Sequence, residues 1–214
     1  MMEIEEQILT DKQILIMETA EKLFATNGYD ATSIRDIANA GSFNSAMISY
    51  YFGSKEQLME GILNYRTTKL ENVVTDLLLG LKDPLDKLLA LNNFYIQKVL
   101  QHKYFYLLIF QIQSLPEKHT LIRNFYNTLR YNNFKMITGI IRDGQAKGDF
   151  KEGINCSFLM FVISGTMNNF LVNQDYYKDV NHKNDLSEQE FDLHIREELG
   201  QLLTEIIKDM VVKK

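Results

Sequence analysis

Proline interrupts helices more strongly than any other residue, and this chain of 214 residues contains only two prolines, Pro84 and Pro116. The proline ring removes a backbone hydrogen-bond donor and clashes with the preceding helical turn. Long stretches without proline can therefore remain helical. Apolar residues spaced three or four positions apart recur along these stretches, which is the spacing of a helix with one buried face. The sequence predicts an all-α protein.

The first 57 residues predict a small unit of three short helices. Ser33 and Asp36 have the spacing of a capping box, and Asn44 is a favourable N-cap for the third helix. Gly28 and Gly53 follow the first and third helices as residues that can turn the chain. The three helices are expected at residues 12–27, 32–40 and 44–52.

The remaining residues, 58–214, predict a larger helical domain that one long helix joins to the first unit, residues 1–57. Ser54 and Gln57 have capping-box spacing at the start of that helix. The polar segment 173–185 has no helical period and is expected to form a loop. Helices are expected at residues 54–77, 83–102, 103–113, 117–148, 154–173 and 187–214.

Composition argues against several classes of protein. The single cysteine, Cys156, cannot form an intramolecular disulfide, and the acidic segment 1–12 does not have the pattern of a signal peptide. The longest apolar run, residues 158–163, is far shorter than the ~20 residues that span a bilayer. We therefore expect a cytoplasmic protein that does not interact with a membrane.

The sequence contains no pattern typical of an enzyme or a metal site. The histidines His102, His119, His182 and His194 do not have metal-ligand spacing, and no serine or cysteine lies in a catalytic motif. Histidines at the surface or at helix ends are the simpler interpretation. We expect no catalytic residue, no bound metal and no cofactor.

The three-helix unit has the outline of a helix-turn-helix, in which the N-terminal residues of the last helix meet base edges in the major groove. Its charge is unfavourable for DNA, because residues 1–60 contain four Lys or Arg and ten Asp or Glu. Helix N-termini can bind phosphate without a formal charge, and Lys55 would add a cation. Spacing alone is equally compatible with a small helical core that has ordinary caps.

Residues 23–58 resemble the N-terminal module of the tetracycline-repressor (TetR/AcrR) family of bacterial transcriptional regulators. The matching residues are Leu23-Phe24, Gly28-Tyr29, Thr32-Ser33, Asp36-Ile37-Ala38, Tyr51-Phe52, Ser54-Lys55-Glu56 and Leu58. The resemblance implies an all-α homodimer that binds double-stranded operator DNA through its third helix and an unknown small-molecule effector through its C-terminal domain. The residues then expected to contact DNA are Ser33, Arg35, Asn44, Ser45, Ala46, Met47, Ser49, Tyr50 and Lys55.

The sequence departs from the family pattern at two places. The family usually has Ala-Gly-Val between the second and third helices, whereas this chain has Gly41-Ser42-Phe43. Ser42 must then adopt the conformation that glycine normally supplies, at a cost of about 1 kcal/mol. Many members have a phosphate-contacting tyrosine where this chain has Ser49, and Tyr50 is the neighbour that can take over the contact. Tyr51 and Phe52 are expected to pack in the core.

Residues 94–177 contain sixteen aromatic residues, most of which must belong to the core. Small-molecule sites are also apolar and aromatic, and the family binds its effectors among these helices, so we expect a pocket here. The residues expected to line it are Tyr95, Phe110, Tyr126, Phe134 and Asn169. The resemblance further implies a dimer interface between the helices at 154–173 and 187–214, with Phe161, Leu199, Leu202 and Ile206 in it, although the last helix could also pack entirely within the monomer.

Two functional hypotheses follow. In the first, the protein is a repressor whose paired recognition helices move away from operator spacing when an effector binds. In the second, it is an all-α ligand-binding or scaffold protein whose helix-turn-helix no longer binds DNA. The acidic first unit and the altered turn favour the second hypothesis, and the long fourth helix that joins the two domains favours the first.

Overall fold

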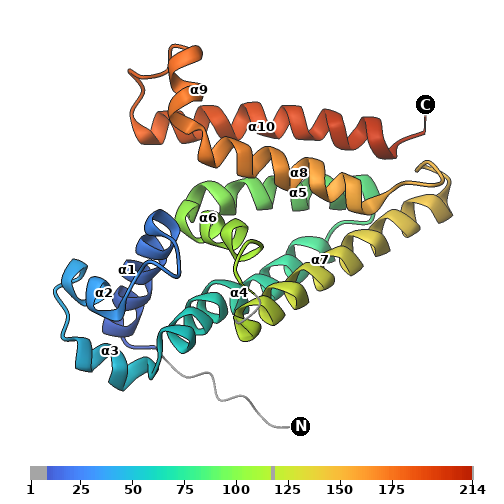
Figure 1. Cartoon of the computed structure of the whole chain (residues 1–214). Helices are drawn as coiled ribbons and strands as arrows, with labels where there is room; N and C mark the ends of the chain where they lie inside the picture. Colours follow the sequence, from blue (N-terminus) through green and yellow to red (C-terminus); the bar gives the residue numbers. More distant parts are fainter. Residues whose placement is uncertain (1–8, 117–118, 214) are drawn as a thin grey trace, which may run out of the picture.

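The computed structural model describes residues 9–116 and 119–213, and within these ranges the chain is helical (Figure 1). The described ranges contain no strand, and their single isolated bridge joins Phe150 to Val212. The prediction of an all-α protein is confirmed. The helices are α1 (Asp11–Asn27), α2 (Ile34–Ala40), α3 (Ser45–Phe52), α4 (Lys55–Leu79), α5 (Pro84–Gln101), α6 (Lys103–Ile112), α7 (Thr120–Lys147), α8 (Cys156–Val172), α9 (Gln174–Val180) and α10 (Glu188–Val211).

The helices form two bodies that α4 connects. Helices α1, α2 and α3 gather at one corner of the molecule, and α4 leaves that corner towards the larger body formed by α5, α7, α8 and α10 (Figure 1). Helix α10 packs along α5, and α6 packs on α1. Helix α6 therefore lies between the two bodies and contacts both.

Capping explains most of the helix boundaries. Ser33 with Asp36 and Ser187 with Glu190 form complete capping boxes at the starts of α2 and α10, as their spacing predicts. At the start of α4 only half of the predicted box forms, because the Ser54 side chain accepts a bond from the Gln57 N–H while the Ser54 N–H donates to the carbonyl of Phe52. Glu117, the expected start of α7, lies outside the described residues.

Helix α9 occupies part of the segment that was expected to be a loop. Residues 173–185 have no apolar period, but Gln174–Val180 form two helical turns. Two side chains attach them to the core: the Tyr177 ring lies 5.8 Å from the Phe170 ring and 6.0 Å from the Phe191 ring and its hydroxyl donates to Glu198, and the Lys178 ammonium lies 4.4 Å from the centre of the Phe191 ring. The prediction was wrong because a few contacts with distant residues leave no periodic signal in the sequence.

The core consists of three clusters of buried side chains. The first contains residues of α1, α2, α3 and the start of α4, together with Phe105, Leu108 and Ile112 of α6. The second joins α5, α8 and α10, and the third joins α5, α7, α8 and α10. Tyr106 and Leu107 of α6 pack against both the first and the second cluster. Because the first cluster continues past residue 57, the domain boundary at 57/58 stays a prediction.

Asn92 is a buried polar residue in the middle of this core. It lies on α5 one turn after Leu88 of the third cluster and one turn before Ile96 of the second, and its relative exposure is 4%. Neither its amide nitrogen nor its amide oxygen has a hydrogen-bond partner among the described residues. A buried polar group in this state costs roughly 1–3 kcal/mol.

We therefore expect Asn92→Leu, which keeps the number and branching of the side-chain heavy atoms and removes the two polar atoms, to stabilise the protein by roughly 1–3 kcal/mol. Urea denaturation followed by circular dichroism at a fixed protomer concentration measures this change. Asn93→Leu at the exposed neighbouring position is the matched control and should change stability by less than about 0.5 kcal/mol. A loss of stability in Asn92→Leu would show that the amide makes a favourable interaction in the native state.

Candidate functional site

Helix α3 presents a polar face to the solvent and an apolar face to the core. Ile48 is 1% exposed and belongs to the first cluster, whereas Tyr50 is 84% exposed. Ser45, Ala46 and Ser49 are exposed on the same face of the helix as Tyr50, because these residues are adjacent or one helical turn apart. Met47, Tyr51 and Phe52 are partly buried and pack against the first cluster, in agreement with the core role expected for the last two. A helix with this exposed face can enter the major groove of DNA.

Asn44 fixes where the exposed face of α3 begins. It is extended, and its side-chain oxygen accepts a hydrogen bond of 2.8 Å from the N–H of Ala46. The cap uses only this oxygen, so the amide donors of Asn44 are not needed for it. The residues expected to meet the bases, Asn44 to Met47, thus form the first turn of α3, although Met47 offers only part of its side chain.

The turn between α2 and α3 explains why its glycine is displaced from the usual family position. A Cβ atom on Gly41 would lie 2.0 Å from a ring carbon of Phe43, so Gly41 makes room for that ring. Ser42 takes the positive φ of 54° that was expected of it. The ammonium of Lys12 lies 5.2 Å from the centre of the Phe43 ring and thus brings a cation from α1 to the turn. The sequence offered no short-range signal for this contact.

Ser33 forms hydrogen bonds with Asp36 at the start of α2. Its hydroxyl donates to the Asp36 carboxylate at 2.7 Å, its N–H donates to the same oxygen at 2.7 Å, and the hydroxyl accepts from the Asp36 N–H. These bonds from Ser33 hold the pKa of Asp36 below its ordinary value. A carboxylate at this helix end repels phosphate, so a DNA contact at Ser33 stays a prediction that the local charge does not favour. Arg35, in the first turn of α2, is exposed.

Lys55 has a structural role that its position in the sequence did not indicate. Its ammonium donates to the carbonyl oxygens of Tyr29 at 2.9 Å and Thr32 at 3.0 Å, and it lies 4.3 Å from the centre of the Tyr29 ring. These bonds tie the start of α4 to the loop between α1 and α2. A phosphate contact through Lys55 would compete with them, and this contact stays a prediction.

The five residues expected to line a ligand pocket do not gather around one space. The rings of Tyr95 and Tyr106 lie 5.6 Å apart, and burial, with Tyr106 and Tyr126 close by, raises the pKa of Tyr95. Phe110 packs against the same second cluster as Tyr95. Phe134 is 37% exposed on α7, and Asn169 is exposed on α8, so neither joins this aromatic group.

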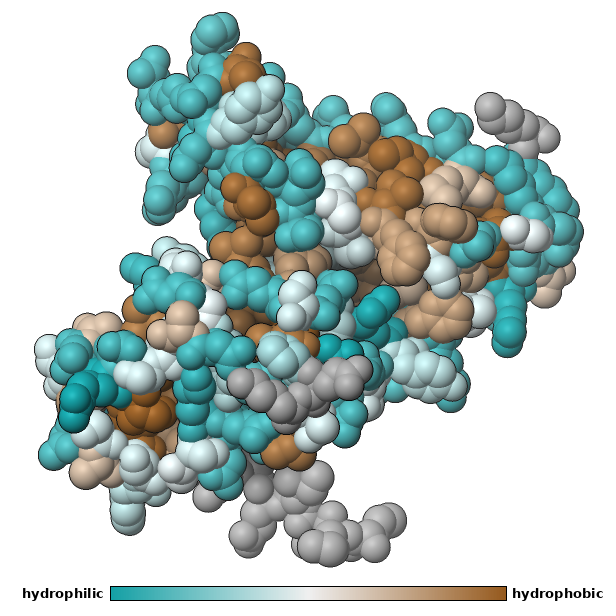
Figure 2. Space-filling model, viewed as in Figure 1, coloured by the Kyte–Doolittle hydropathy of each residue, from teal (hydrophilic) through white to brown (hydrophobic). Residues whose placement is uncertain are grey.

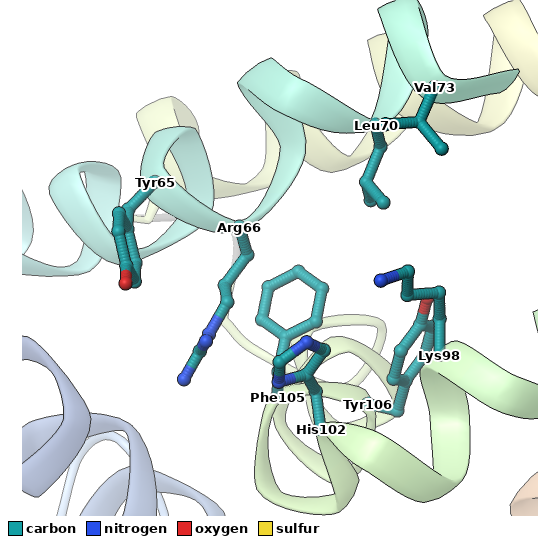
Figure 3. A pocket seen from close by; sticks show the side chains of 8 residues that line it. All are labelled: Tyr65, Arg66, Leu70, Val73, Lys98, His102, Phe105 and Tyr106. Carbon is teal, nitrogen blue, oxygen red and sulfur yellow. The ribbon is translucent and has the colours of Figure 1, made fainter. Parts of the chain in front are cut away.

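A cavity of about 240 Å³ lies beside this aromatic group, between α4 and the junction of α5 with α6 (Figure 3). None of the five expected residues lines it. The sequence did not indicate this cavity, because the polar residues that line it come from three helices and are spread over more than 30 positions of the chain. The lining residues are Tyr65, Arg66, Leu70, Val73, Lys98, His102, Phe105 and Tyr106.

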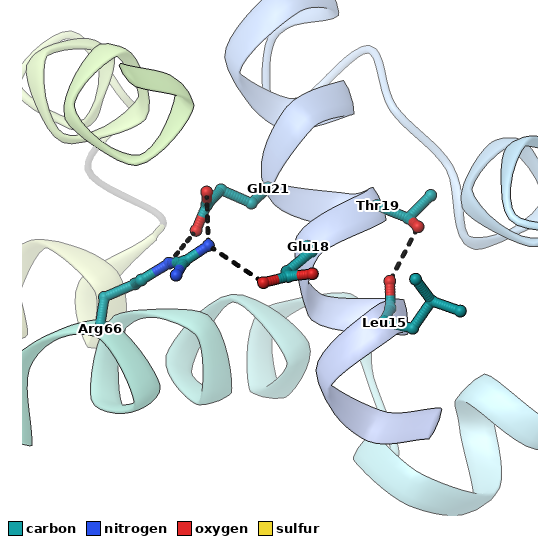
Figure 4. A network of polar contacts seen from close by, with 5 residues as sticks. All are labelled: Leu15, Glu18, Thr19, Glu21 and Arg66. Carbon is teal, nitrogen blue, oxygen red and sulfur yellow. Dashed lines mark hydrogen bonds and ion pairs between the residues drawn. The ribbon is translucent and has the colours of Figure 1, made fainter. Parts of the chain in front are cut away.

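Arg66, in the wall of this cavity, ties α4 to α1 (Figure 4). Its guanidinium donates to both carboxylate oxygens of Glu21, at 2.7 and 3.1 Å, and lies 3.7 Å from Glu18. The Glu21 side chain is 6% exposed and that of Arg66 is 13% exposed. Burial raises the pKa of Glu21 even though Arg66 acts in the opposite direction. The pair connects the cavity to the helix-turn-helix unit.

Helix α8 leaves an apolar face uncovered. Phe158, Phe161, Val162 and Val172 are 61%, 54%, 37% and 65% exposed, and Figure 2 shows apolar side chains gathered over this helix. On α10, Leu202 is 47% exposed. Leu199 is only 8% exposed and Ile206 packs against the second cluster, so both belong mainly to the protomer core and have little surface to offer a partner. Of the four expected interface residues, Phe161 and Leu202 are the accessible ones.

The described residues contain neither a metal-binding cluster nor a single helix that could span a membrane. Among the described residues, no group of three or more His, Cys, Asp or Glu side chains is arranged to hold a metal ion. No single helix in the described ranges has the length and apolar composition needed to cross a membrane. Helices α8 and α9 meet these two criteria only when taken together, and they are bent by 78° relative to each other.

Comparison with known proteins agrees with this arrangement. The profile of the bacterial regulatory proteins of the tetR family matches residues 16–62, which include α2, α3 and the start of α4. The HTH-type transcriptional repressor KstR2 of Mycolicibacterium smegmatis is 26% identical over 151 residues, which cover 71% of this chain and 73% of the relative. The HTH-type transcriptional repressor NicS of Pseudomonas putida is 29% identical over 139 residues, 65% of this chain and 66% of the relative.

A solved structure extends the similarity of the fold to nearly the whole chain. The ketosteroid transcriptional regulator KstR2 of Mycobacterium tuberculosis superimposes with a TM-score of 0.71 at 19% identity, over 96% of this chain and 97% of the other. At that identity the superposition establishes the fold. The exposed face of α3, the match of its unit to the family profile and the shared fold lead to one conclusion: residues 16–62 form the DNA-binding unit of the TetR family of bacterial regulatory proteins, and the chain is a DNA-binding transcriptional regulator.

Proposed function

We propose that this regulator is a homodimeric repressor that a small-molecule effector releases from its operator. In the DNA-bound state, the two α3 helices lie in successive major grooves about 34 Å apart. Effector binding in the larger body favours a second arrangement of α4, in which the α3 helices no longer match this spacing. The effector needs only a difference in affinity for the two arrangements, about 1.4 kcal/mol for each tenfold loss of DNA binding.

The observation that carries the DNA-binding part of the proposal is the exposed face of α3. Ser45, Ala46 and Ser49 are small and can approach base edges closely, and Tyr50 extends from the same face. Residues 1–60 contain ten acidic and four basic residues, so affinity must depend on caps, helix dipoles and shape more than on lysine.

The observation that supports a homodimer is the uncovered apolar face of α8. Monomeric proteins rarely expose several large apolar side chains side by side, and such patches mark interaction sites. With a two-fold axis beside α8 and α10, these two helices and their copies would form a bundle of four helices. Phe161 and Leu202 would then lie in the interface. The same axis would set the separation of the two α3 helices.

Ala46→Glu tests the assigned DNA surface. It puts a carboxylate on the exposed first turn of α3 in both subunits, where it meets the phosphate-rich groove, and like charges brought together at an interface cost several kcal/mol. We expect operator affinity to fall by about 100-fold or more. The measurement is a gel shift at low salt with DNA from upstream of the protein's own gene and with sequences selected from a random pool.

Ala146→Glu is the matched control, because Ala146 is an exposed alanine on α7 in the other body. It should leave operator affinity unchanged. Equal affinities of wild type and Ala46→Glu would contradict the assigned surface. If the folded wild-type dimer binds no DNA from either source at low salt, the alternative of a ligand-binding or scaffold protein with an inactive helix-turn-helix is favoured.

A further inference from the structure

The cavity between α4 and the α5–α6 junction combines apolar walls with two cationic side chains. Leu70 and Val73 line it from α4, and Phe105 and Tyr106 line it from α6. In Figure 3 the Lys98 ammonium and the His102 ring point into the space below Leu70, whereas the guanidinium of Arg66 points away from it, towards α1. No acidic residue is among the eight that line the cavity.

The positive charges around this space are only partly compensated. Arg66 is paired with Glu21, while the Lys98 ammonium donates to the neutral amide oxygen of Gln101 at 3.2 Å and lies 5.5 Å from the centre of the Phe94 ring. Burial, together with Arg66 and Lys98, holds the pKa of His102 below its ordinary value, because each of these opposes a further positive charge. An anion in the cavity would offset the positive charges of Arg66 and Lys98 and would favour a proton on His102.

We propose that this cavity binds the anionic head group, above all the carboxylate, of a small amphipathic organic acid. Lys98 and His102 would hold the carboxylate, and the leucine, valine and aromatic walls would hold the adjoining carbon atoms. The volume of about 240 Å³ lies below the usual range of drug-sized sites, so the cavity takes a small acid or the head of a longer one. This inference deepens the proposed function, on which it rests, by naming the chemical class of the effector.

The position of the cavity links its occupant to the DNA-binding unit. Its walls come from α4, which leads to α3, and from α6, which packs on α1. Arg66 contributes to the wall and holds Glu21 of α1. A carboxylate placed between Lys98 and His102 therefore acts on two of the helices that contact the helix-turn-helix unit, α4 and α6.

The test compares acids with neutral molecules of the same shape on the full-length protein without DNA. The probes are the straight-chain carboxylic acids from butanoate to decanoate and benzoate, each paired with its primary amide, at constant ionic strength. We expect at least one acid to raise the melting temperature and to bind at least about tenfold more tightly than its amide in isothermal titration calorimetry. The proposal is overturned if no acid stabilises the protein at tens of millimolar, or if every acid and amide bind equally.

Variants assign the binding to the cavity. Lys98→Met keeps most of the length of the side chain and removes its charge, so acid affinity should fall about tenfold, whereas Lys98→Arg should retain most of it. Lys87→Met, on the same helix but outside the cavity, is the matched control and should bind acid like the wild type. Equal losses in Lys98→Met and Lys87→Met would contradict the assigned site, and the wild-type comparison decides the question if Lys98→Met does not fold.

Failure of this inference can be separated from failure of the proposed function. Acid binding is measured without DNA, so it does not depend on an operator, and operator binding by the unliganded protein does not depend on an acid. If an acid binds through Lys98 and releases operator DNA, both proposals are supported. An acid that binds through Lys98 and leaves the operator complex unchanged supports the site and contradicts its role in release.

Discussion

Replacement of Arg66 by methionine is expected to lower the free energy of unfolding by about 3–5 kcal/mol, because it leaves the buried carboxylate of Glu21 without a partner. Arg66 supplies both hydrogen bonds to that carboxylate, whose side chain is 6% exposed. The methionine keeps much of the aliphatic stem that packs in the cavity wall. Urea denaturation followed by circular dichroism, at one protomer concentration for all variants, measures the change.

Two controls separate the lost ion pair from lost packing. The double variant Glu21→Leu/Arg66→Met replaces both charges by apolar groups and should recover most of the stability, since such replacements are often neutral. Glu18→Gln should cost less than about 1 kcal/mol, because its carboxylate is 47% exposed and 3.7 Å from the guanidinium. A double variant as unstable as Arg66→Met alone would mean that packing, not the stranded charge, causes the loss.

Local signals in the sequence predicted most of the fold. The capping boxes at Ser33 and Ser187 begin α2 and α10 as expected, and Gly53 ends α3 with a positive φ of 73°. These features depend on residues within about four positions of one another, so they can be read along the chain. Helix α9 depends instead on Tyr177 packing against Phe191, fourteen positions away, and no local pattern predicts it.

The same distinction holds for the candidate site. The exposed face of α3 follows from helical spacing and from the family resemblance, because both concern one continuous segment. The bonds of Lys55 to Tyr29 and Thr32 span 26 and 23 positions, and the Arg66–Glu21 pair spans 45. Only the packing of α1, α4 and α6 brings such residues together. Sequence reasoning therefore predicted the exposed face of α3 and missed the cavity that is lined by Arg66, Lys98 and His102.

Phe161→Glu is expected to convert the protein to a monomer and to weaken operator binding by about 10²–10⁴-fold, which is the usual gain from linking two binding modules. Phe161 is 54% exposed on the apolar face of α8, so the change should leave the protomer folded. In a two-fold interface, the new carboxylate would be buried opposite an apolar surface or its own copy. Sedimentation velocity measures the association state, and a gel shift with the full operator measures affinity.

Tyr131→Glu is the matched control, because Tyr131 is an aromatic residue that is 65% exposed on α7, a helix that is not part of the proposed interface. It should remain dimeric and bind the operator like the wild type. A dimeric Phe161→Glu variant would move the interface away from this face of α8. A monomeric variant that still bound the full operator as tightly as wild type would contradict the pairing of the α3 helices, because a single helix can then contact only one half-site.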